Sequence, residues 1–233
     1  AAGGGRISAV LQGSGGFTKV GAGTLVLDAA NTYSGTTSIT EGTLRVERNT
    51  GSLPASGVSF ASTVGLTIDN VGASGALTQS VGPLSFAGGA GTVALVRTAS
   101  QDLGLSASSL TVATGATGNF VPGGGTNSAT NGFAIAGQAS GFMGAGLYYN
   151  GANFAWYDAG GFVRGIDYGV DAGTRTTAGT ISGTNIGSIA HQQFTGGLID
   201  DQTGATFTTL AFTAAGNYRQ FGTTTVTGIL FSG

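Results

Sequence analysis

The sequence has 233 residues, of which 46 are glycine, 40 % are hydrophobic and only 8 % are charged. Ordinary soluble domains are roughly 25 % charged, and disordered chains are poorer in apolar residues, so the sequence predicts a folded protein with an unusual surface. A net charge of −2, with the basic residues scattered singly, excludes an electrostatic footprint for nucleic acid or anionic lipid. The absence of cysteine excludes disulfides and thiolate metal sites.

The sequence contains no apolar run long enough to span a membrane and no signal-peptide pattern. It begins with AAGGG, which resembles the interior of a protein. We therefore expect a segment of a longer polypeptide.

Short strands are predicted along most of the chain, with apolar and polar residues alternating and with Gly, Asn, Asp or Ser between them. The predicted strands are Ile7–Leu11, Thr24–Leu27, Thr37–Ile39, Thr43–Val46, Val58–Phe60, Leu66–Ile68, Leu84–Phe86, Thr92–Val96, Leu110–Val112, Phe133–Ile135, Phe162–Arg164, Leu210–Thr213 and Thr223–Phe231. No window shows the 3.6-residue period of a helix. Strands this short, with small residues at the bends, favour a solenoid with three strands per turn over a barrel.

One structural unit is written almost twice near the start of the chain. Gly23–Leu27 reads GTLVL, and Gly42–Val46 reads GTLRV 19 positions later. A short strand that recurs at this interval is typical of successive coils of a parallel β-helix. We expect the apolar side chains of the unit to point inward and stack on the next coil, and Asn31 to hydrogen-bond its turn or to stack in a ladder with an Asn one coil away. The expected inward residues are Leu25, Leu27, Ile39, Leu44 and Val46.

The predicted organisation has three regions. Residues 1–131 are a β-solenoid that contains the repeat at 17–48, residues 132–172 are an inserted hairpin subdomain, and residues 173–233 continue the solenoid. The insert is predicted from its aromatic residues, which are Phe133, Phe142, Tyr148, Tyr149, Phe154, Trp156, Tyr157, Phe162 and Tyr168.

Residues 17–46 read FTKVGAGTLVLDAANTYSGTTSITEGTLRV. This segment resembles the autotransporter-associated β-strand repeat, also called the passenger-associated transport repeat, whose pattern is roughly LTKxGxGTLxLxGxNTYxGxTxxxxGTLxx. The departures are Phe17 for Leu and Ala29 for Gly. The resemblance implies an all-β, right-handed parallel β-helix that is exported to a bacterial cell surface, with structural or adhesive work.

Parallel β-helices also include enzymes that cut acidic polysaccharides with clustered carboxylates or with basic residues. The adjacent carboxylates here are Asp200 and Asp201, with His191 nine residues earlier and Arg219 later. Neighbouring residues on a strand face opposite ways, so only one of the two could enter a shared cleft. Their flanking glycines favour a solvated turn, and we predict no enzymatic activity.

A metal site or other cofactor is not predicted. A single histidine without cysteine excludes a transition-metal cluster, and we expect His191 on the surface or in a loop. Asp158, Asp167 and Asp171 lie between glycines and are expected in turns. Asp167 with Asp171 could contribute to a calcium site, but calcium needs six or more oxygen ligands.

Two features bear on partners. Tyr148, Tyr149, Trp156 and Tyr157 are residue types that stack on sugar rings or anchor an interface, although they can equally form a small core of the insert. Neither end of the solenoid carries a charged or proline-rich cap, so we predict head-to-tail stacking of copies into a fibre. The alternatives are a carbohydrate-binding adhesin module that uses the aromatic insert, and a polysaccharide-degrading β-helix.

Overall fold

A computed structural model describes residues 3–48, 51–179, 181–184, 187–201, 204–220 and 222–232, with only the backbone described at 181–184, 198–201, 217 and 220. Every regular element in this part of the chain is a β-strand, so none of the described residues forms a helix that could cross a membrane. The contacts divide the chain into two units. Unit 1 comprises residues 1–140, 149–151 and 157–164, and unit 2 comprises residues 141–148, 152–156 and 165–233.

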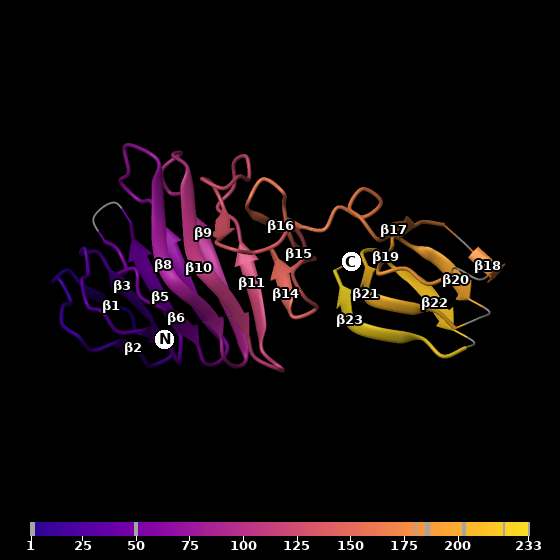
Figure 1. Cartoon of the computed structure of the whole chain (residues 1–233), viewed down its shortest axis with the longest axis horizontal. Helices are drawn as coiled ribbons and strands as arrows, with labels where there is room; N and C mark the ends of the chain where they lie inside the picture. The colour runs from indigo at the N-terminus through magenta and orange to yellow at the C-terminus, as the bar shows by residue number, and fades with distance from the viewer. Residues whose placement is uncertain are drawn as a thin grey trace. The chain divides into compact units, whose positions relative to one another are not determined.

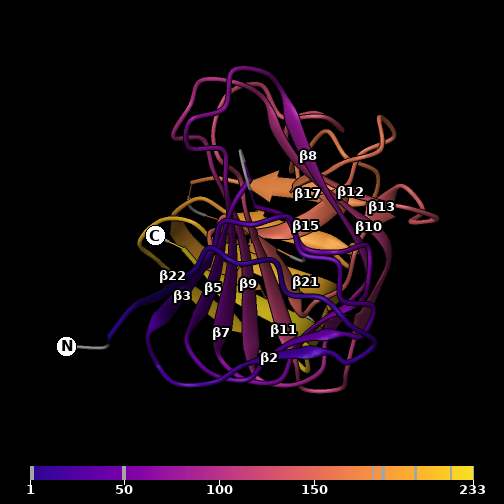
Figure 2. The same cartoon turned by 90° about the vertical axis from the view of Figure 1, so that its left-hand side faces the viewer.

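Unit 1 is a coil of parallel strands in two sheets (Figure 1). The odd-numbered sheet runs β1 (Gly5–Ile7), β3 (Thr24–Leu27), β5 (Thr43–Glu47), β7 (Val64–Asp69), β9 (Ala90–Val96) and β11 (Thr117–Val121). The even-numbered sheet runs β2 (Phe17–Lys19), β4 (Thr37–Ile39), β6 (Val58–Phe60), β8 (Leu77–Phe86), β10 (Leu103–Val112) and β12 (Phe133–Ile135). Each turn of chain therefore adds one strand to each sheet, which is consistent with a β-solenoid. Figure 2 shows β3, β5, β7 and β9 side by side.

The register of the odd-numbered sheet brings equivalent apolar side chains into columns. Leu27, Val46, Ile68 and Leu95 form one such column, and all four are buried. Burying one such side chain contributes roughly 1.5–3 kcal/mol, so this column is a large part of what holds the coil together. The inward stacking expected for Leu27, Ile39, Leu44 and Val46 is thus observed, while Leu25 is half-buried.

Phenylalanine rings continue the core towards the later coils. Phe60 and Phe86 stack with centroids 5.1 Å apart, and Phe86 meets Phe120 edge-on at 6.0 Å. Glycine makes room for these rings, because a Cβ built at Gly91 would lie 2.5 Å from a ring carbon of Phe86, and one at Gly118 would also collide with that ring. The rings fill the space that the glycines leave free, so the core is densely packed.

The sequence predicts three strands per turn, and the structure has two. The third side of the first coils is a loop held by an isolated bridge between Ala30 and Ser52 and by buried Asn31. Asn31 Nδ2 donates to Ala29 O and Ser52 O, each at 2.9 Å, and Leu11 N donates to Asn31 Oδ1 at 2.9 Å. The predicted bonding of Asn31 to its turn is confirmed, but its neighbours one coil away are a leucine and a serine.

Unit 2 contains a second pair of parallel sheets. One runs β17 (Thr174–Thr177), β19 (His191–Phe194), β21 (Thr206–Phe212) and β23 (Thr225–Phe231), and the other runs β18 (Ile181–Thr184), β20 (Gly197–Asp201) and β22 (Gly216–Gln220). Phe194, Ala205, Phe207 and Leu210 form the buried core of this unit. The rings of Phe212 and Phe231 stack on this core in a ladder with Phe194, at 5.4 and 5.0 Å.

The aromatic region forms short strands. These are β13 (Gly141–Phe142), β14 (Leu147–Tyr149), β15 (Asn153–Tyr157) and β16 (Val163–Gly165). Residues of the predicted insert at 132–172 are divided between unit 1 and unit 2. The described contacts therefore define two units, where the sequence predicts three regions.

Candidate functional site

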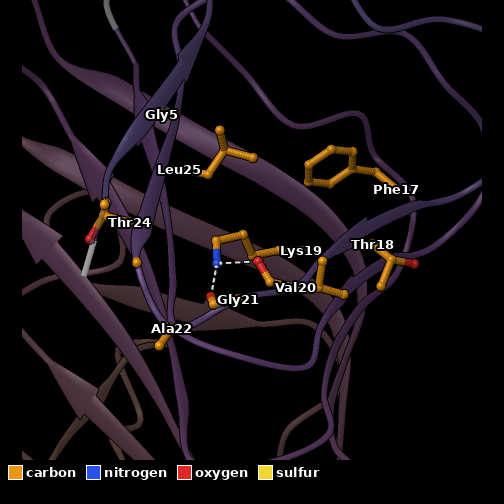
Figure 3. Close-up of a pocket in the computed structure, with 11 residues that line it drawn as sticks. Gly5, Phe17, Thr18, Lys19, Val20, Gly21, Ala22, Thr24 and Leu25 are labelled. Carbon is orange, nitrogen blue, oxygen red and sulfur yellow. Dashed lines mark hydrogen bonds between the residues drawn. The ribbon is translucent and has the colours of Figure 1, made fainter. Parts of the chain in front are cut away.

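A hollow opens beside the edge strands β1 and β2 of unit 1, with a volume of about 480 Å³. Its lining includes Gly3, Gly5, Phe17 and Leu25, and Figure 3 shows the last two side chains on one side of it. The hollow lies beside strands that have no further strand on their outer side among the described residues, and two of its lining residues carry no side chain. Phe17 and Leu25 are only half-buried there, although their register partners Thr37 and Leu44 are buried.

Lys19 closes one column of the core next to this hollow. Its register partner is Ile39, whose own partner is Phe60, so a lysine occupies a position that the next coils fill with apolar side chains. The ammonium group is buried and donates to Val20 O at 2.9 Å, Gly21 O at 2.5 Å and Glu41 O at 3.0 Å. Three donors meet three carbonyl acceptors on the turns of two successive coils (Figure 3 shows the first two bonds).

The sequence predicts no charged cap at either end of the solenoid. Lys19 adds a charged side chain that ends one column of the core at the first coil. The signal was in the repeat itself, because Lys19 and Ile39 occupy equivalent positions in successive coils. The open part of this end is the odd-numbered side, around Gly5 and Leu25.

A second polar group lies along the outside of unit 1. Arg6 Nη1 lies 2.6 Å from Asp28 Oδ2 and 2.8 Å from Glu47 Oε2, and Arg45 Nη2 lies 2.5 Å from Asp69 Oδ2. Hydrogen bonds from Arg6 hold the pKa of Asp28 and of Glu47 below the usual range of a carboxyl group. Each of these carboxylates pairs with an arginine, so the group joins coils together.

The core of unit 2 is open at β23. Ile229 and Phe231 are in register with the core residues Leu210 and Phe212, yet they are 48 % and 75 % exposed. Together with Tyr218 and Val226 they line an apolar groove of about 400 Å³. Residues in an inward-facing column are exposed here because no strand covers β23 and no ring stacks beyond Phe231 among the described residues.

The four predicted interaction residues do not share one surface within either unit. Tyr149 and Tyr157 belong to unit 1, where Asn127 Nδ2 donates to Tyr149 Oη at 3.0 Å and buried Tyr157 donates to Ile135 O at 2.8 Å. Tyr148 and Trp156 belong to unit 2 and are half-buried. Tyr148 stacks on Phe154 at 5.6 Å. Carbohydrate binding by these residues stays a prediction.

The predicted position of His191 is wrong. It lies in β19, is 5 % exposed and has Nδ1 2.9 Å from Thr209 Oγ1. Nothing in the sequence around His191 signals this burial, because the side chains that cover it come from residues 141–156.

The acidic residues singled out in the sequence have different environments. Asp200 and Asp201 lie in β20, so the turn expected for them is wrong, and their side chains lie outside the described residues. Asp200 is the backbone register partner of Arg219. Asp158 accepts bonds from Arg164 Nε and Gly160 N, each at 2.7 Å.

Asp167 and Asp171 lie in a turn. Asp167 N donates to Asp171 Oδ2 at 2.7 Å, so that carboxylate holds the turn. Across the described residues no group of three or more His, Cys, Asp or Glu side chains is arranged to hold a metal ion.

The fold defines a class of protein: an all-β protein in which coils of parallel strands stack on one another. Residues 17–46 match the family model of the passenger-associated-transport-repeat, and the chain carries this repeat as the sequence predicts. The repeat implies a passenger-type protein of the cell surface. No curated protein and no solved structure matches the chain.

Proposed function

We propose that the chain is a non-enzymatic structural segment of an exported surface protein, a right-handed parallel β-helix whose copies stack head to tail into a fibre. The observation that carries this proposal is the exposure of Ile229 and Phe231, two residues in an inward-facing column of unit 2. Stacking on another coil would remove this apolar surface from water, at about 25 cal/mol per Å².

The two open ends are different, which favours a fibre over a closed dimer. Unit 2 presents the edge strand β23 with the exposed ring of Phe231, and unit 1 presents β1 and a hollow beside Gly5. Contact between two unlike surfaces leaves one of each free, so addition of copies continues. We assign the Phe231 ring of one copy to the hollow of the next.

The surface of the protein supports association. Only 8 % of the residues are charged, and charge is the main protection of a soluble protein against self-association. The arginines of unit 1 are engaged within their own coil stack, so they add little repulsion at the ends.

Sedimentation velocity over a concentration series tests the proposal. Wild type should form species larger than the monomer, while Phe231→Asp and Ile229→Asp should each weaken association at least about tenfold, because a buried unpaired charge costs more than 1.4 kcal/mol. Val170→Asp is the matched control, since Val170 is 77 % exposed in a turn outside the groove. A wild type that stays monomeric at every concentration, or three variants that behave alike, contradicts the proposal.

A further inference from the structure

The chain has one histidine and one tryptophan, and both lie in one cluster of unit 2. The centroid of the His191 ring is 4.4 Å from that of Phe142 and 6.2 Å from that of Trp156. On its other side, His191 Nδ1 meets the hydroxyl of the fully buried Thr209. An imidazole that could titrate near neutral pH is thus enclosed between aromatic rings and a sheet.

The aromatic side chains cover one face of the sheet that contains His191. Thr174, His191, Thr209 and Gly228 are register partners on β17, β19, β21 and β23, and they form one column. A Cβ at Gly228 would lie 2.9 Å from Ala145 Cβ and 3.4 Å from a ring carbon of Phe154. Residues 141–147 and 153–156, which we call the aromatic cover, therefore lie against this column. The other face of the same strands carries the core of the unit.

The strands of the cover, β13, β14 and β15, are hydrogen-bonded neighbours in one sheet, and aromatic rings of the cover pack against His191 of β19. Within it, Met143 N donates to Ala155 O at 3.2 Å, and Phe142 packs edge-on against Phe154 at 6.1 Å. Phe142 and Trp156 both contact the imidazole ring of His191. Release of the cover from β19 and β21 would therefore break ring contacts and leave the strand pairing within the cover in place.

The charged groups around His191 offer its cation no described partner. Residues 141–148 and 152–156 contain no charged side chain, and neither does β21. Arg175 of β17 donates to Gln192 Oε1, which belongs to the opposite face of β19. Asp171 holds its own turn by accepting from Asp167 N.

The uncharged titratable groups near His191 are tyrosines. Burial raises the pKa of Tyr168 to about 12, with a small opposite effect from Thr209, so this residue stays neutral at physiological pH. Tyr148 of β14 stacks on Phe154. Tyr168 therefore supplies no negative charge for an imidazolium.

Burial and ring contacts act in opposite directions on this imidazole. Phe142 and Trp156 would favour a cation only where the cation lies over the ring face. Trp156 meets His191 at 84°, and burial without a counter-ion is the larger effect. Burial therefore lowers the pKa of His191.

We infer that His191 is an acid-sensitive latch, whose protonation releases the aromatic cover from β19 and β21. In the closed state the neutral imidazole fits between Thr209 and Phe142. In the open state the ring reaches water and takes up a proton at its ordinary pKa of about 6.5. Above this value the equilibrium between the closed and open states does not depend on pH.

Linkage fixes the size of the effect. Between about pH 6.5 and the lower pKa of the closed state, the open fraction should rise about tenfold for each unit of pH. Below the closed-state pKa both states carry the proton, and the rise stops.

Trp156 and His191 report on the latch directly because each is the chain's one residue of its type. We would follow the emission of Trp156 between pH 8 and pH 4.8 and, separately, the imidazole carbon-bound protons of His191 by NMR. Wild type should give a histidine pKa below 6.5 and a red shift of the tryptophan emission in the same range. His191→Gln, which keeps a hydrogen-bonding side chain but cannot titrate, should give no shift, and Phe142→Ala should be red-shifted already at pH 8.

Hydrogen exchange separates the opening of the latch from general unfolding. The emission of Trp156 should shift at pH 5 while the amides of β21 keep their protection. A histidine pKa of 6.5 or above overturns the inference, as does an unchanged transition in His191→Gln. Simultaneous loss of protection in β21 also overturns it, because the whole unit would then be unfolding. If His191→Gln does not fold, the NMR titration of wild type decides alone.

Discussion

Arg6 and Glu47 form a bidentate pair across 41 positions of sequence, with Nη1 and Nη2 each 2.8 Å from a carboxylate oxygen. The pair joins β1 to β5, which are separated by β3 in the sheet. Arg6 also bonds Asp28, which follows β3, so one guanidinium ties three successive coils together. The chain has few charged residues, and these three form ion pairs that connect successive coils.

This pair predicts a specific acid sensitivity. The folded-state pKa values of Asp28 and Glu47 are lowered by Arg6, so their stabilising effect is complete above the unfolded pKa values of about 3.9 and 4.3 and is lost as the pH falls below them. The melting temperature of wild type should therefore fall steeply below about pH 4.3. In Arg6→Gln the fall should be shallower, and the two proteins should converge at pH 2.

High salt provides the control for this prediction, because 1 M salt shortens the screening length to about 3 Å and weakens exposed pairs. Wild type in 1 M salt should resemble Arg6→Gln. Parallel melting curves for the two proteins at every pH would show that the pair contributes nothing to folding.

Replacing Lys19 by Met tests the cap of the first coil. Methionine keeps the length and burial of the side chain but leaves three carbonyl oxygens without their donor, which should destabilise the protein by about 1–3 kcal/mol. Chemical denaturation would measure this difference, and Thr18→Ala, at the exposed neighbouring position, should be neutral within about 0.5 kcal/mol. A Lys19→Met protein as stable as wild type would mean that water satisfies these carbonyls.

A double-mutant cycle tests the packing between Gly118 and Phe86. Gly118→Ala should destabilise by about 1–3 kcal/mol because its methyl group would collide with the ring of Phe86. Phe86→Leu removes the obstacle at the cost of a cavity. In the combined variant the alanine should cost less than it does alone, with a coupling energy of about 0.5–3 kcal/mol. If the two free-energy changes are additive, the destabilisation by Gly118→Ala does not come from a collision with the ring of Phe86.

Asn31→Ala tests the loop on the third side of the coil. The change removes three hydrogen bonds that connect Leu11, Ala29 and Ser52, and it leaves buried backbone groups without partners. We expect a loss of about 1–3 kcal/mol and faster hydrogen exchange at Leu11. Asn31→Asp, which keeps the acceptor but loses both donors, should retain part of the protection at Leu11. Equal effects of the two substitutions would exclude a role for the acceptor.

The parts of the fold that follow from local pattern could be predicted from the sequence. The strands Thr24–Leu27, Thr37–Ile39 and Val58–Phe60 have the bounds predicted, because alternation and flanking glycine determine them locally. Strands without that alternation were missed. One is β2, whose inward residue is the charged Lys19.

Features that depend on distant segments could not be predicted in this way. The burial of His191 depends on Phe142, which lies almost fifty residues earlier in the sequence. Phe231 is exposed because no other described strand lies on the outer side of β23. The division of the aromatic region between two units likewise depends on which strands pair. The hollow near Gly5 depends on which strand lies at the edge of the sheet, and a short stretch of sequence does not show this.

The proposed head-to-tail joint can be tested by a disulfide, because the chain contains no cysteine. A protein carrying both Gly5→Cys and Phe231→Cys should form, on mild oxidation, a ladder of covalent oligomers on a non-reducing gel, since the joint brings the two positions of neighbouring copies together. Gly5→Cys with Val170→Cys, which places the second thiol outside the groove, should give no ladder above background. Equal ladders from the two proteins, or only monomer from the first, would contradict head-to-tail assembly.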